Sequence, residues 1–588
     1  MKRLNKILFL LGPNDKKRAI FLLFIILILA IIEMIGVVSI MPLMAVLMNP
    51  EMVNSNIYLN SIFKISGIFG VETVFQFLIF LSALFFFILT FSLSLKIFTT
   101  YYTNWVVNLC NYNISKKLLD GYLNQPYIWF LNRHSADLSK TILSEIIAVV
   151  KQGLNPTLIL IKQSLITLLL ITVLILVNLK LTLIIGFTFG LFYGIIFLTT
   201  RGYIKKLGKE RLDSNRILFT TISEAFGGVK EVKINGLEDI YVNKFSSPAK
   251  KIVKIQTLFG FLNLIPRFAL EFIVFGGLLL VVLYLMISYG SIDEAFPIIS
   301  LFAYTCYRIM PALQGIFTSI TQIRFVGPSL DALYLELKNL KTYKSDLTKS
   351  NLMKFKNVIN LKNINFNYPN AKNFAVKNLN FDIKLGEKVG IIGTTGSGKT
   401  TVMDIILGLI EPQNGTLKVD NTVIDRNNLR AWQSLIGYVP QTIFLTDDTI
   451  AGNIALGVDT ELIDMDMVEK AAKIANLHEF ITNELSEKYL TTVGERGIRL
   501  SGGQRQRIGI ARALYHKPKI LFLDEATSAL DNITEKKVMD RLFNSNKDMT
   551  IIMIAHRLST VRVCDNILLL EKGEIKAQGK FEDLIKEN

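Results

Sequence analysis

The 588-residue chain has few of the side chains that build disulfide frameworks and metal sites, with three cysteines and four histidines. The cysteines, Cys110, Cys306 and Cys564, lie far apart and form neither a C-x-x-C pair nor a Cys/His metal spacing. This scarcity argues against a disulfide-stapled fold and fits a reducing cytoplasmic setting. We interpret the cysteines as small apolar packing residues.

Acidic residues are too few to balance the basic ones, and the formal net charge is +17. From Lys356 onward, however, 30 Lys and Arg stand against 29 Asp and Glu, so the excess belongs to the first part of the chain. That part also holds the long apolar stretches, beside which basic residues are the usual result of the positive-inside bias. The charge therefore does not indicate nucleic-acid binding.

Long apolar stretches are abundant: hydrophobic residues make up 51% of the chain, which is high for a soluble domain. A helix needs about 20 apolar residues to cross roughly 30 Å of hydrocarbon. Six stretches qualify, at about Ala19–Met48, Val74–Phe98, Thr157–Val177, Leu181–Thr200, Phe261–Tyr289 and Phe296–Ile320. The first is too long for a signal peptide and has Ile31–Met34 in place of a small-residue cleavage site, so it is interpreted as a span.

Three of the connections almost lack positive charge. They lie at 49–73, 178–180 and 290–295, and their only basic residues are Lys64 and Lys180. The alternating connections, and the segment before the first span, are rich in lysine or arginine. Because Lys and Arg are retained on the cytoplasmic side, both chain ends are expected in the cytoplasm.

The two long basic connections contain helix-like segments at Asn113–Leu131 and Arg211–Phe226. The spanning helices are therefore expected to continue into the cytoplasm, where they are candidates for mechanical coupling. On the other side, Asn56–Ile68 places apolar residues near one face of a helix. This segment is interpreted either as a helix on the outer membrane surface or as an ordinary ordered loop.

The composition divides the chain into three parts. Residues 1–325 are predicted to form a transmembrane domain with six spans, 326–355 a linker, and 356–588 a further domain. The linker follows from the polar, lysine-rich stretch Tyr334–Lys354, which has no apolar run able to hold a span.

A glycine-rich segment follows the strand-like run Val389–Ile392 and precedes the helix-like run Thr401–Ile410. It matches the phosphate-loop pattern G-x-x-x-x-G-K-[ST] and reads Gly393-Thr394-Thr395-Gly396-Ser397-Gly398-Lys399-Thr400. Its glycines let backbone N–H groups close around phosphate oxygens, and the helix N-terminus favours negative charge. Lys399 is expected to contact the β- and γ-phosphates of ATP and Thr400 to bind Mg²⁺, with Thr401 beside the nucleotide.

Four apolar residues, Ile520–Leu523, lead into two carboxylates, Asp524 and Glu525. The apolar run predicts a central parallel strand that is buried on both faces. At its C-terminal end Asp524 is expected to reach the Mg²⁺ shell, because ligands gather there in open α/β sheets. Glu525 is expected to polarise the attacking water. The alternative, two acids that cap a helix, does not explain the phosphate loop beside them.

The run Leu500-Ser501-Gly502-Gly503-Gln504 resembles the signature sequence of ABC transporters. It is a second glycine-rich turn entering a helix, so Ser501 and backbone N–H groups are able to meet a phosphate. With the phosphate loop and the acidic strand end in this order, the chain is identified as resembling an ABC exporter half-transporter. The resemblance implies a multidomain protein: an all-α six-helix transmembrane domain of the exporter fold, then an α/β P-loop NTPase nucleotide-binding domain.

Further family positions match residue by residue within 356–588. Tyr368 resembles the aromatic residue that stacks on adenine, although a packed strand tyrosine is the alternative. Gln441 resembles the glutamine that senses Mg²⁺, and His556 the histidine that holds the γ-phosphate. Asp531 lies in a segment that resembles the dimer-contacting loop.

Other matched positions concern contacts with further parts of the family's assembly. Gly494–Gly497 resembles the exporter loop that meets the cytoplasmic ends of the spans. The family's phosphate loop and a partner's signature enclose each ATP, so the resemblance implies a dimer. A homodimer is favoured, with a heterodimer as the alternative, and alternating access driven by hydrolysis at Glu525 is the expected mechanism.

Ionisable residues within the apolar stretches bear on the cargo, because burying charge in a membrane is costly. Glu33, Lys162, Arg267, Glu271 and Arg308 are such residues. Arg267 and Glu271, four residues apart, are able to pair with each other. Arg308 is expected to have no partner at helical spacing and, with Arg267, would suit an anionic cargo such as a pyrophosphate headgroup.

The stretches around Pro266-Arg267, Arg308 to Pro311 and Glu33 to Pro42 resemble those of the bacterial lipid-linked oligosaccharide flippase of N-glycosylation. That resemblance implies a polyprenyl-pyrophosphate glycan as cargo in the bacterial inner membrane. An exporter of another lipid, a polysaccharide, a drug or a peptide is the alternative; no peptidase-like domain precedes the first span, which disfavours peptides.

Overall fold

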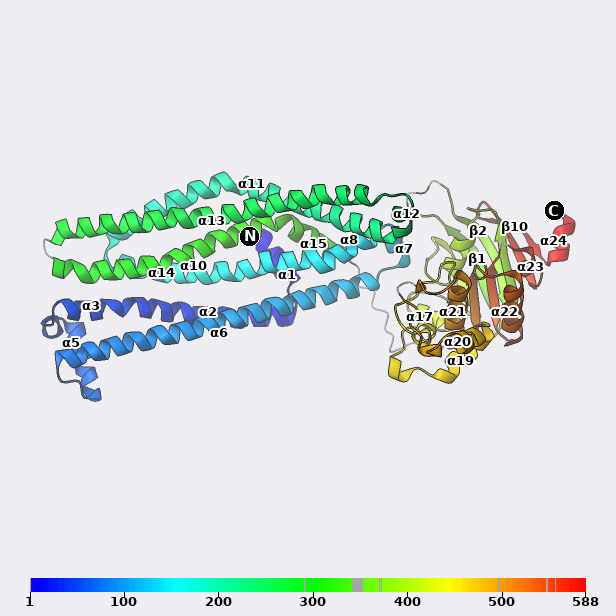
Figure 1. The fold of residues 1–588 in the computed structure, drawn as a ribbon, viewed down its shortest axis with the longest axis horizontal. Coiled ribbons are helices and arrows are strands. Elements are labelled where there is room, and N and C mark those ends of the chain that lie inside the picture. The colour runs from blue at the N-terminus through cyan, green and yellow to red at the C-terminus, as the bar shows by residue number, and fades with distance from the viewer. Residues whose placement is uncertain are drawn as a thin grey trace. The chain divides into compact units, whose positions relative to one another are not determined.

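The computed structural model describes residues 2–289, 292–340, 353–369, 371, 373–494, 497–545, 548–555 and 557–587. The chain forms two compact units. We call Met1–Gln125 with Asn132–Thr342 the helical unit, and Pro126–Leu131 with Tyr343–Asn588 the α/β unit. Figure 1 labels their elements.

The helical unit is built of helices throughout its described residues. The elements are α1 (Lys2–Leu10), α2 (Pro13–Val38), α3 (Ile40–Met48), α4 (Met52–Ser55), α5 (Ile57–Ser66), a 3₁₀ turn (Gly67–Phe69), α6 (Val74–Leu123), α8 (Ser135–Lys140), a π-helical turn (Thr141–Glu145), α9 (Ile146–Val149), a second π-helical turn (Val150–Leu154), α10 (Asn155–Val177), α11 (Leu179–Gly227), α12 (Val229–Ile234), α13 (Glu238–Tyr289), α14 (Ile292–Phe325) and α15 (Gly327–Asn339).

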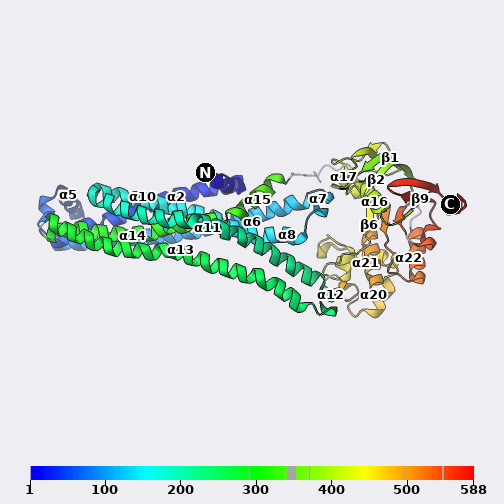
Figure 2. The same cartoon turned by 90° about the horizontal axis from the view of Figure 1, so that it is seen from above.

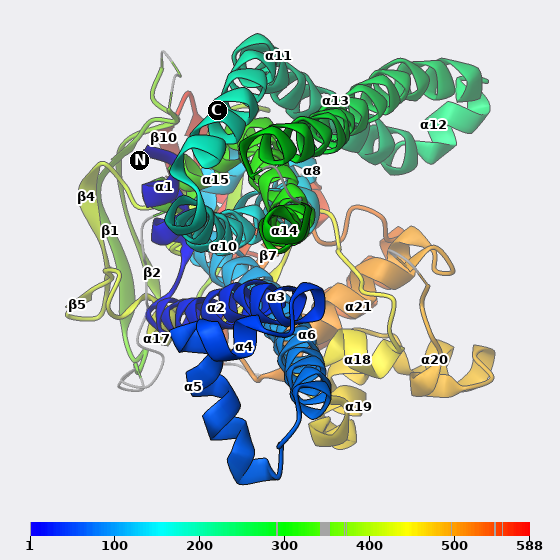
Figure 3. The ribbon, with the colours of Figure 1, turned by 90° about the vertical axis from the view of Figure 1, so that its left-hand side faces the viewer.

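Three helix pairs form the bundle: α2 with α6, α10 with α14, and α11 with α13. Seen along the bundle in Figure 3, α10 and α14 lie between the other two pairs, in agreement with Figure 1. Figure 2 shows α11 and α13 side by side as far as α12, which joins them. With 50 residues, α6 is roughly 75 Å long, well over the 30 Å of hydrocarbon. The helices therefore do continue beyond the predicted spans.

Five helices of the described residues are long and apolar enough to cross a membrane: Pro13–Met48, Val74–Leu123, Ser135–Val177, Glu238–Gly277 and Phe296–Phe325. Each overlaps one of the six predicted spans, although Glu238–Gly277 shares only residues 261–277 with the predicted Phe261–Tyr289. The remaining predicted span, Leu181–Thr200, lies on α11, where the side chains of several residues are outside the described part.

Two segments outside the spans bear on the sequence expectations. Between the first two spans, Ile57–Ser66 is a helix whose Phe63 ring packs edge-on against Phe77, with centroids 5.1 Å apart. The start of the predicted linker 326–355 is not extended, because Gly327–Asn339 forms α15, which packs against α1 and α11. Residues 341–352 lie outside the described part.

The α/β unit contains two sheets. Its elements are α7 (Tyr127–Leu131), β1 (Val358–Phe366), β2 (Val376–Lys384), β3 (Lys388–Gly393), α16 (Lys399–Ile406), β4 (Asn414–Val419), β5 (Thr422–Val423), α17 (Leu429–Gln433), β6 (Ile436–Val439), α18 (Ile450–Ile454), 3₁₀ turns (Thr460–Leu462 and Lys488–Leu490), α19 (Met465–Ile474), α20 (His478–Glu484), α21 (Gly502–Tyr515), β7 (Ile520–Asp524), α22 (Asn532–Ser545), β8 (Thr550–Ile554), α23 (Leu558–Val561), β9 (Asn566–Glu571), β10 (Glu574–Gly579) and α24 (Phe581–Glu587).

The larger sheet has the strand order β10-β9-β3-β8-β7-β6. The five strands from β9 to β6 run parallel, and β10 pairs antiparallel with β9. Every residue of β7 and β8 is buried, as expected for parallel strands covered on both faces. The smaller sheet is antiparallel, in the order β2-β1-β4-β5.

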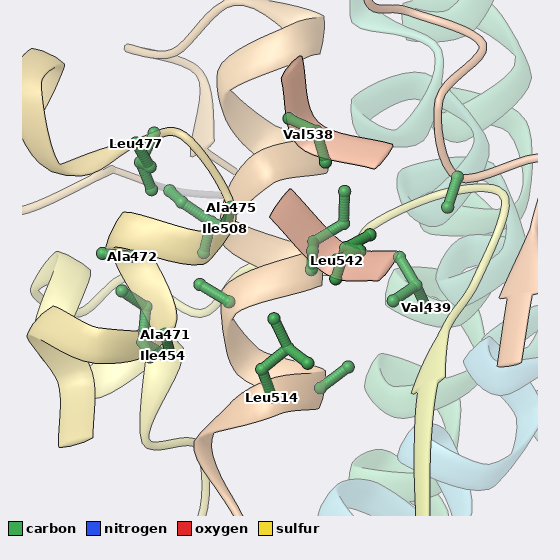
Figure 4. Close-up of a cluster of buried hydrophobic side chains, with 14 of the residues drawn as sticks. Val439, Ile454, Ala471, Ala472, Ala475, Leu477, Ile508, Leu514, Val538 and Leu542 are labelled. Atoms are coloured by element: carbon green, nitrogen blue, oxygen red, sulfur yellow. The ribbon is translucent and has the colours of Figure 1, made fainter. Parts of the chain in front are cut away.

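Two apolar clusters fix the larger sheet in place. One includes side chains from β6 and from the helices α19, α21 and α22, and Figure 4 shows Leu477, Ile508 and Leu542 among its members. The other joins both sheets around the fully buried Trp432, whose Nε1 donates to the carbonyl oxygen of Ile406 at 2.8 Å. These two clusters pack around β3 and β7 and so hold the carboxyl ends of both strands in position.

Candidate functional site

The glycine-rich loop connects the end of β3 to α16. Gly393, Gly396 and Gly398 have φ angles of 152°, 81° and 99°. A Cβ at Gly393 would lie 2.2 Å from the carbonyl oxygen of Leu570, and one at Gly398 would lie 2.5 Å from that of Ala375. Both contacts are with backbone, so only glycine fits at these two positions.

Lys399 and Ser397 show that this loop suits a phosphate. The Lys399 side chain is buried, and its Nζ donates to the carbonyl oxygens of Gly393 and Thr394, both at 2.9 Å. The Ser397 hydroxyl is also buried and has no hydrogen-bond partner among the described residues. An unmet buried hydroxyl costs free energy, and a phosphate oxygen in the loop would satisfy it.

Glu525, which follows β7, lies in contact with Gln441, in the loop after β6. Gln441 Nε2 donates to Glu525 Oε2 at 2.8 Å. Glu525 has a φ of 48°, a left-handed conformation that is uncommon outside glycine and asparagine. Such backbone strain is often found at functional positions.

Asp524 ends β7 and is buried close to another carboxylate, Asp404 of α16. Burial and, secondarily, the Asp524 charge raise the pKa of Asp404 to about 6. Asp404 was not predicted from the sequence; its position one turn after the phosphate loop was the only available signal. A cation beside Asp524 would relieve this repulsion.

A magnesium ion fits the oxygen donors at this edge of the sheet, which are Thr400, Asp524 and Gln441. Among the described residues, no group of three His, Cys, Asp or Glu side chains forms a metal site. Mg²⁺ typically takes one or two carboxylates and completes its shell with waters and nucleotide phosphates. The donor set therefore suits magnesium bound together with ATP.

The signature run begins α21 with a capping box. Ser501 Oγ accepts from the N–H of Gln504 at 3.2 Å, and Gln504 Oε1 accepts from the N–H of Ser501 at 2.7 Å. Gly503 lies against the backbone of Ala529, since a Cβ there would be 3.2 Å from the Ala529 carbonyl oxygen. Within the described residues, the hydrogen bonds of Ser501 and Gln504 do not reach the phosphate loop.

Tyr368 lies beside the helix that follows the phosphate loop. Its hydroxyl is 3.2 Å from Thr401 Oγ1, and its half-buried ring packs edge-on against Phe366. The ring is therefore both packed and close to the predicted nucleotide site, so the two interpretations of this tyrosine are compatible.

Asp531 caps α22 by accepting from the N–H groups of Ile533 and Thr534, at 3.1 and 2.9 Å. Hydrogen bonds from Thr534 are the main cause that lowers the pKa of Asp531. His556 and the Glu495–Arg496 pair of the matched exporter loop lie outside the described residues.

A buried network next to Asp531 escaped the sequence analysis. Glu535 of α22 accepts from Arg557, from Thr527 at 2.8 Å and from Thr560 at 2.7 Å. Arg557 also donates to the carbonyl oxygen of Leu530 at 3.1 Å. The network thus binds the loop around Asp531 to Arg557, which in the sequence follows the predicted γ-phosphate histidine.

The segment Pro126–Leu131 belongs to the α/β unit, although its neighbours in sequence belong to the helical unit. Ile128 packs against the apolar cluster that joins both sheets. Burial and the charge of Asp404 raise the pKa of Tyr127. One of the two predicted coupling connections thus supplies a helix, α7, to the unit that carries the ATP site.

The two arginines predicted to face the cargo lie on α13 and α14, which pack against each other. Arg267 Nε donates to Glu271 at 2.9 Å, so the pairing that the sequence allowed is present. The expectation that Arg308 has no partner at helical spacing was wrong. Its Nη2 donates to the hydroxyl of Tyr304 at 2.9 Å, a neutral partner that a search for opposite charges overlooks.

Comparisons with known proteins agree with this geometry. Residues 376–528 match the family model described as ABC transporter, and residues 19–309 match that of the ABC transporter transmembrane region. The chain is 30% identical over 492 residues to the ATP-dependent lipid A-core flippase of Saccharophagus degradans, covering 82% of each chain. It is 31% identical over 394 residues to the flippase of the same name from Pectobacterium atrosepticum, covering 65% of each.

A solved structure supports the same fold. It is described as a bacterial Atm1-family ABC exporter with ATP bound, and it has a TM-score of 0.79 over 97% of both chains at 20% sequence identity. The strand end with its two carboxylates, the glycine-rich loop, the apolar helices and these matches together define an ATP-hydrolysing membrane exporter. The chain belongs to the ABC transporter family, as an exporter half-transporter with fused transmembrane and ATP-binding domains.

Proposed function

We propose that this exporter flips a lipid-linked oligosaccharide, a polyprenyl-pyrophosphate glycan, across the bacterial inner membrane by alternating access. The observation that carries the proposal is Arg308. Its guanidinium lies on an apolar spanning helix, is half-buried and has the neutral Tyr304 as its hydrogen-bond partner. A cation in that setting is costly unless an anion accompanies it.

Arg267 supports the same cargo. Glu271 takes the hydrogen bond from Nε, whereas the two terminal nitrogens of Arg267 have no hydrogen bond among the described residues. Arginine binds phosphate groups through those nitrogens in paired hydrogen bonds. Two guanidinium groups on adjoining helices suit a pyrophosphate better than a neutral or cationic cargo.

The relatives support a lipid rather than a soluble cargo, since two of them are named lipid A-core flippases. Other spanning helices also carry ionisable groups: Lys96 Nζ lies 3.6 Å from the buried Glu33, and the two charges balance each other. Lys162, on α10, is half-buried in the span.

For ATP we propose roles that follow from the motif positions. The phosphate loop Gly393–Thr400 holds the phosphates, with Lys399 on the β- and γ-phosphates, and Tyr368 stacks on adenine beside Thr401. Glu525, oriented by Gln441, takes the proton of the attacking water, and His556 holds the γ-phosphate. Thr400, Gln441 and Asp524 would hold Mg²⁺, which when bound neutralises charge on the phosphate oxygens.

We further propose a homodimer with both ATP-binding domains in the cytoplasm. The capped signature, Ser501–Gln504, and Asp531 would complete the partner's ATP site, since their hydrogen bonds within the described residues do not reach the chain's own phosphate loop. Closure of the paired ATP-binding domains would reorient the spans, and α7 would transmit the motion.

Neutralising both arginines tests the proposed cargo. In proteoliposomes, Arg267→Gln with Arg308→Gln is expected to lower ATP-driven glycolipid translocation at least tenfold, because each bidentate phosphate contact is worth more than a neutral hydrogen bond. ATP hydrolysis is expected to persist. The matched control is Lys230→Gln with Lys254→Gln, which removes two exposed cations elsewhere. Unimpaired translocation by the arginine double variant would remove the pyrophosphate argument.

A further inference from the structure

A basic cavity lies in the helical unit, away from Arg267 and Arg308. Its volume is about 610 Å³, within the range of ~300–1,000 Å³ common for small-molecule sites. Four cationic side chains line it: Arg3 of α1, Arg201 and Lys205 of α11, and Arg324 of α14. No carboxylate is among its lining residues.

Among the described residues, no carboxylate forms a salt bridge with the four cationic side chains of the cavity. In the part of the chain that the structure describes, Arg3, Arg201, Lys205 and Arg324 take part in none of the salt bridges, whereas nearby cations do. Arg211 is bonded to Glu145 at 2.7 Å, and Lys6 to Asp331 at 2.6 Å. Carboxylates thus accompany Arg211 and Lys6 near the cavity, and none of the described carboxylates accompanies the four cations that line it.

The guanidinium groups are held in position by neutral contacts. Arg3 Nη1 donates to the carbonyl oxygen of Ile323 at 3.3 Å, and its guanidinium lies 3.0 Å from where a Cβ of Gly327 would be. Arg324 lies over the Phe197 ring, 4.2 Å from its centroid. These contacts fix the orientation of two cations without reducing their charge.

The walls of the cavity are rigid at one end. A Cβ at Gly208 would lie 1.9 Å from the carbonyl oxygen of Phe325, so α11 and α14 touch backbone to backbone just beyond the cavity. Next to this contact, Arg211 of α11 donates to Ser329 of α15 at 2.8 Å. The cationic groups of the two helices are therefore held near each other.

The cavity lies where a membrane surface is expected. Arg201 follows the predicted span Leu181–Thr200, and Arg324 is the penultimate residue of the apolar helix Phe296–Phe325. The rest of the lining is largely apolar, from Leu4, Ile7, Leu160, Ile320 and Ile323. In α1, Leu4, Leu8 and Phe9 are also exposed, as on helices that lie in a membrane interface.

We infer that this cavity binds the phosphate of an anionic phospholipid headgroup in the adjoining membrane leaflet. Arg3, Arg201, Lys205 and Arg324 neutralise and hydrogen-bond the phosphate, and the apolar wall takes the first part of the acyl chains. Basic pockets between spanning helices recognise anionic headgroups in this way. Under the proposed orientation, this is the cytoplasmic leaflet.

Retention of phosphatidylglycerol by the full-length protein tests this site. The protein is placed in nanodiscs of phosphatidylcholine with 20% phosphatidylglycerol, and the lipid that remains bound after transfer to detergent is measured by native mass spectrometry. Arg201→Gln with Arg324→Gln is expected to lower the affinity about 30-fold, since each basic residue contributes roughly fivefold at an anionic surface. Arg201→Lys with Arg324→Lys should retain the lipid.

Three controls decide the source and the place of binding. Lys230→Gln with Lys254→Gln should retain phosphatidylglycerol, and 20 mM inorganic phosphate should not displace it. Equal retention by the Arg201/Arg324 double variant and the parent overturns the inference, and displacement by free phosphate overturns the lipid assignment. Loss of retention in the Arg267/Arg308 variant instead would place the lipid in the cargo cavity. If the double variant does not fold, Arg201→Gln alone serves, because Arg201 is exposed.

Discussion

The α/β unit and the two packed spanning helices α13 and α14 hold their charged groups in different ways. Around the ATP site, side chains from separate strands and helices converge, as when Gln441 reaches Glu525 or when Thr527, Thr560 and Arg557 surround Glu535. In the spanning helices, Arg267 and Arg308 bond within their own helix, four residues away.

This difference follows from what each unit has to do. The α/β unit positions one fixed chemistry, so long-range hydrogen bonds lock its groups before ATP arrives. Under the proposed alternating access the spanning helices move around the cargo, and the local pairs of Arg267 and Arg308 do not tie α13 to α14. Variants in the two units should therefore fail differently.

The largest effect expected in the α/β unit is on hydrolysis. Glu525→Gln removes the proposed general base and should lower the rate of ATP hydrolysis at least about 100-fold. ATP binding should persist, because the phosphate loop is untouched. The measurement is phosphate release by the full-length protein, with Glu574→Gln as a control, since that exposed glutamate pairs with Lys377 on the surface. Hydrolysis at the parental rate would show that Glu525 is not the base.

The buried Asp404 should make stability depend on pH. Its pKa of about 6 lies above the unfolded value, so the folded chain binds the extra proton between about pH 4 and pH 6, and stability falls as the pH rises through that window. Above pH 6 the ionised Asp404 lowers the free energy of unfolding by roughly 2–3 kcal/mol. Without nucleotide and Mg²⁺, Asp404→Asn should therefore have a higher Tm than the parent at pH 7.5.

That advantage of Asp404→Asn should shrink as the pH falls to 5. Thermal unfolding of the full-length protein at several pH values measures it. A difference in Tm that is the same at pH 5 and pH 7.5 would show that the carboxyl group is not the cause.

Substitution in the Glu535 network should have the next largest effect on thermal stability. Glu535→Gln leaves Arg557 without its charged partner. Because the Arg557 side chain is about a third exposed, the free energy of unfolding should fall by roughly 2 kcal/mol, less than for a fully buried pair. This corresponds to a Tm lowered by about 4–8 °C. Glu469→Gln, in an exposed pair with Lys473, should change the Tm by less than 1 °C. Equal shifts in the two variants would contradict the contrast between buried and exposed pairs.

The sequence predicted the parts of this protein that depend on local patterns. The strand Ile520–Asp524, the loop Gly393–Thr400 and the long apolar helices each carry a signal in consecutive residues. Contacts between distant segments left no such signal. Nothing local indicates that Arg557 meets Glu535, or that Pro126–Leu131 belongs to the α/β unit.

The basic residues of the bundle show the same limit. The numbers of Lys and Arg in each connection predicted the orientation of the spans. They do not show which of these cations form ion pairs with carboxylates. Arg211 is neutralised by Glu145, 66 positions earlier, whereas Arg201 on the same helix lines a cavity without carboxylates. Such differences arise from the packing of helices that are remote in sequence.

The most direct test of the proposed function compares two cargoes in proteoliposomes that contain the full-length protein. One is a polyprenyl-pyrophosphate oligosaccharide, and the other carries the same glycan on a polyprenol without phosphate. We predict that ATP drives translocation of the pyrophosphate form at least tenfold faster, and that Glu525→Gln abolishes the difference. Equal rates for the two cargoes, or no ATP-dependent movement of either, would contradict the account.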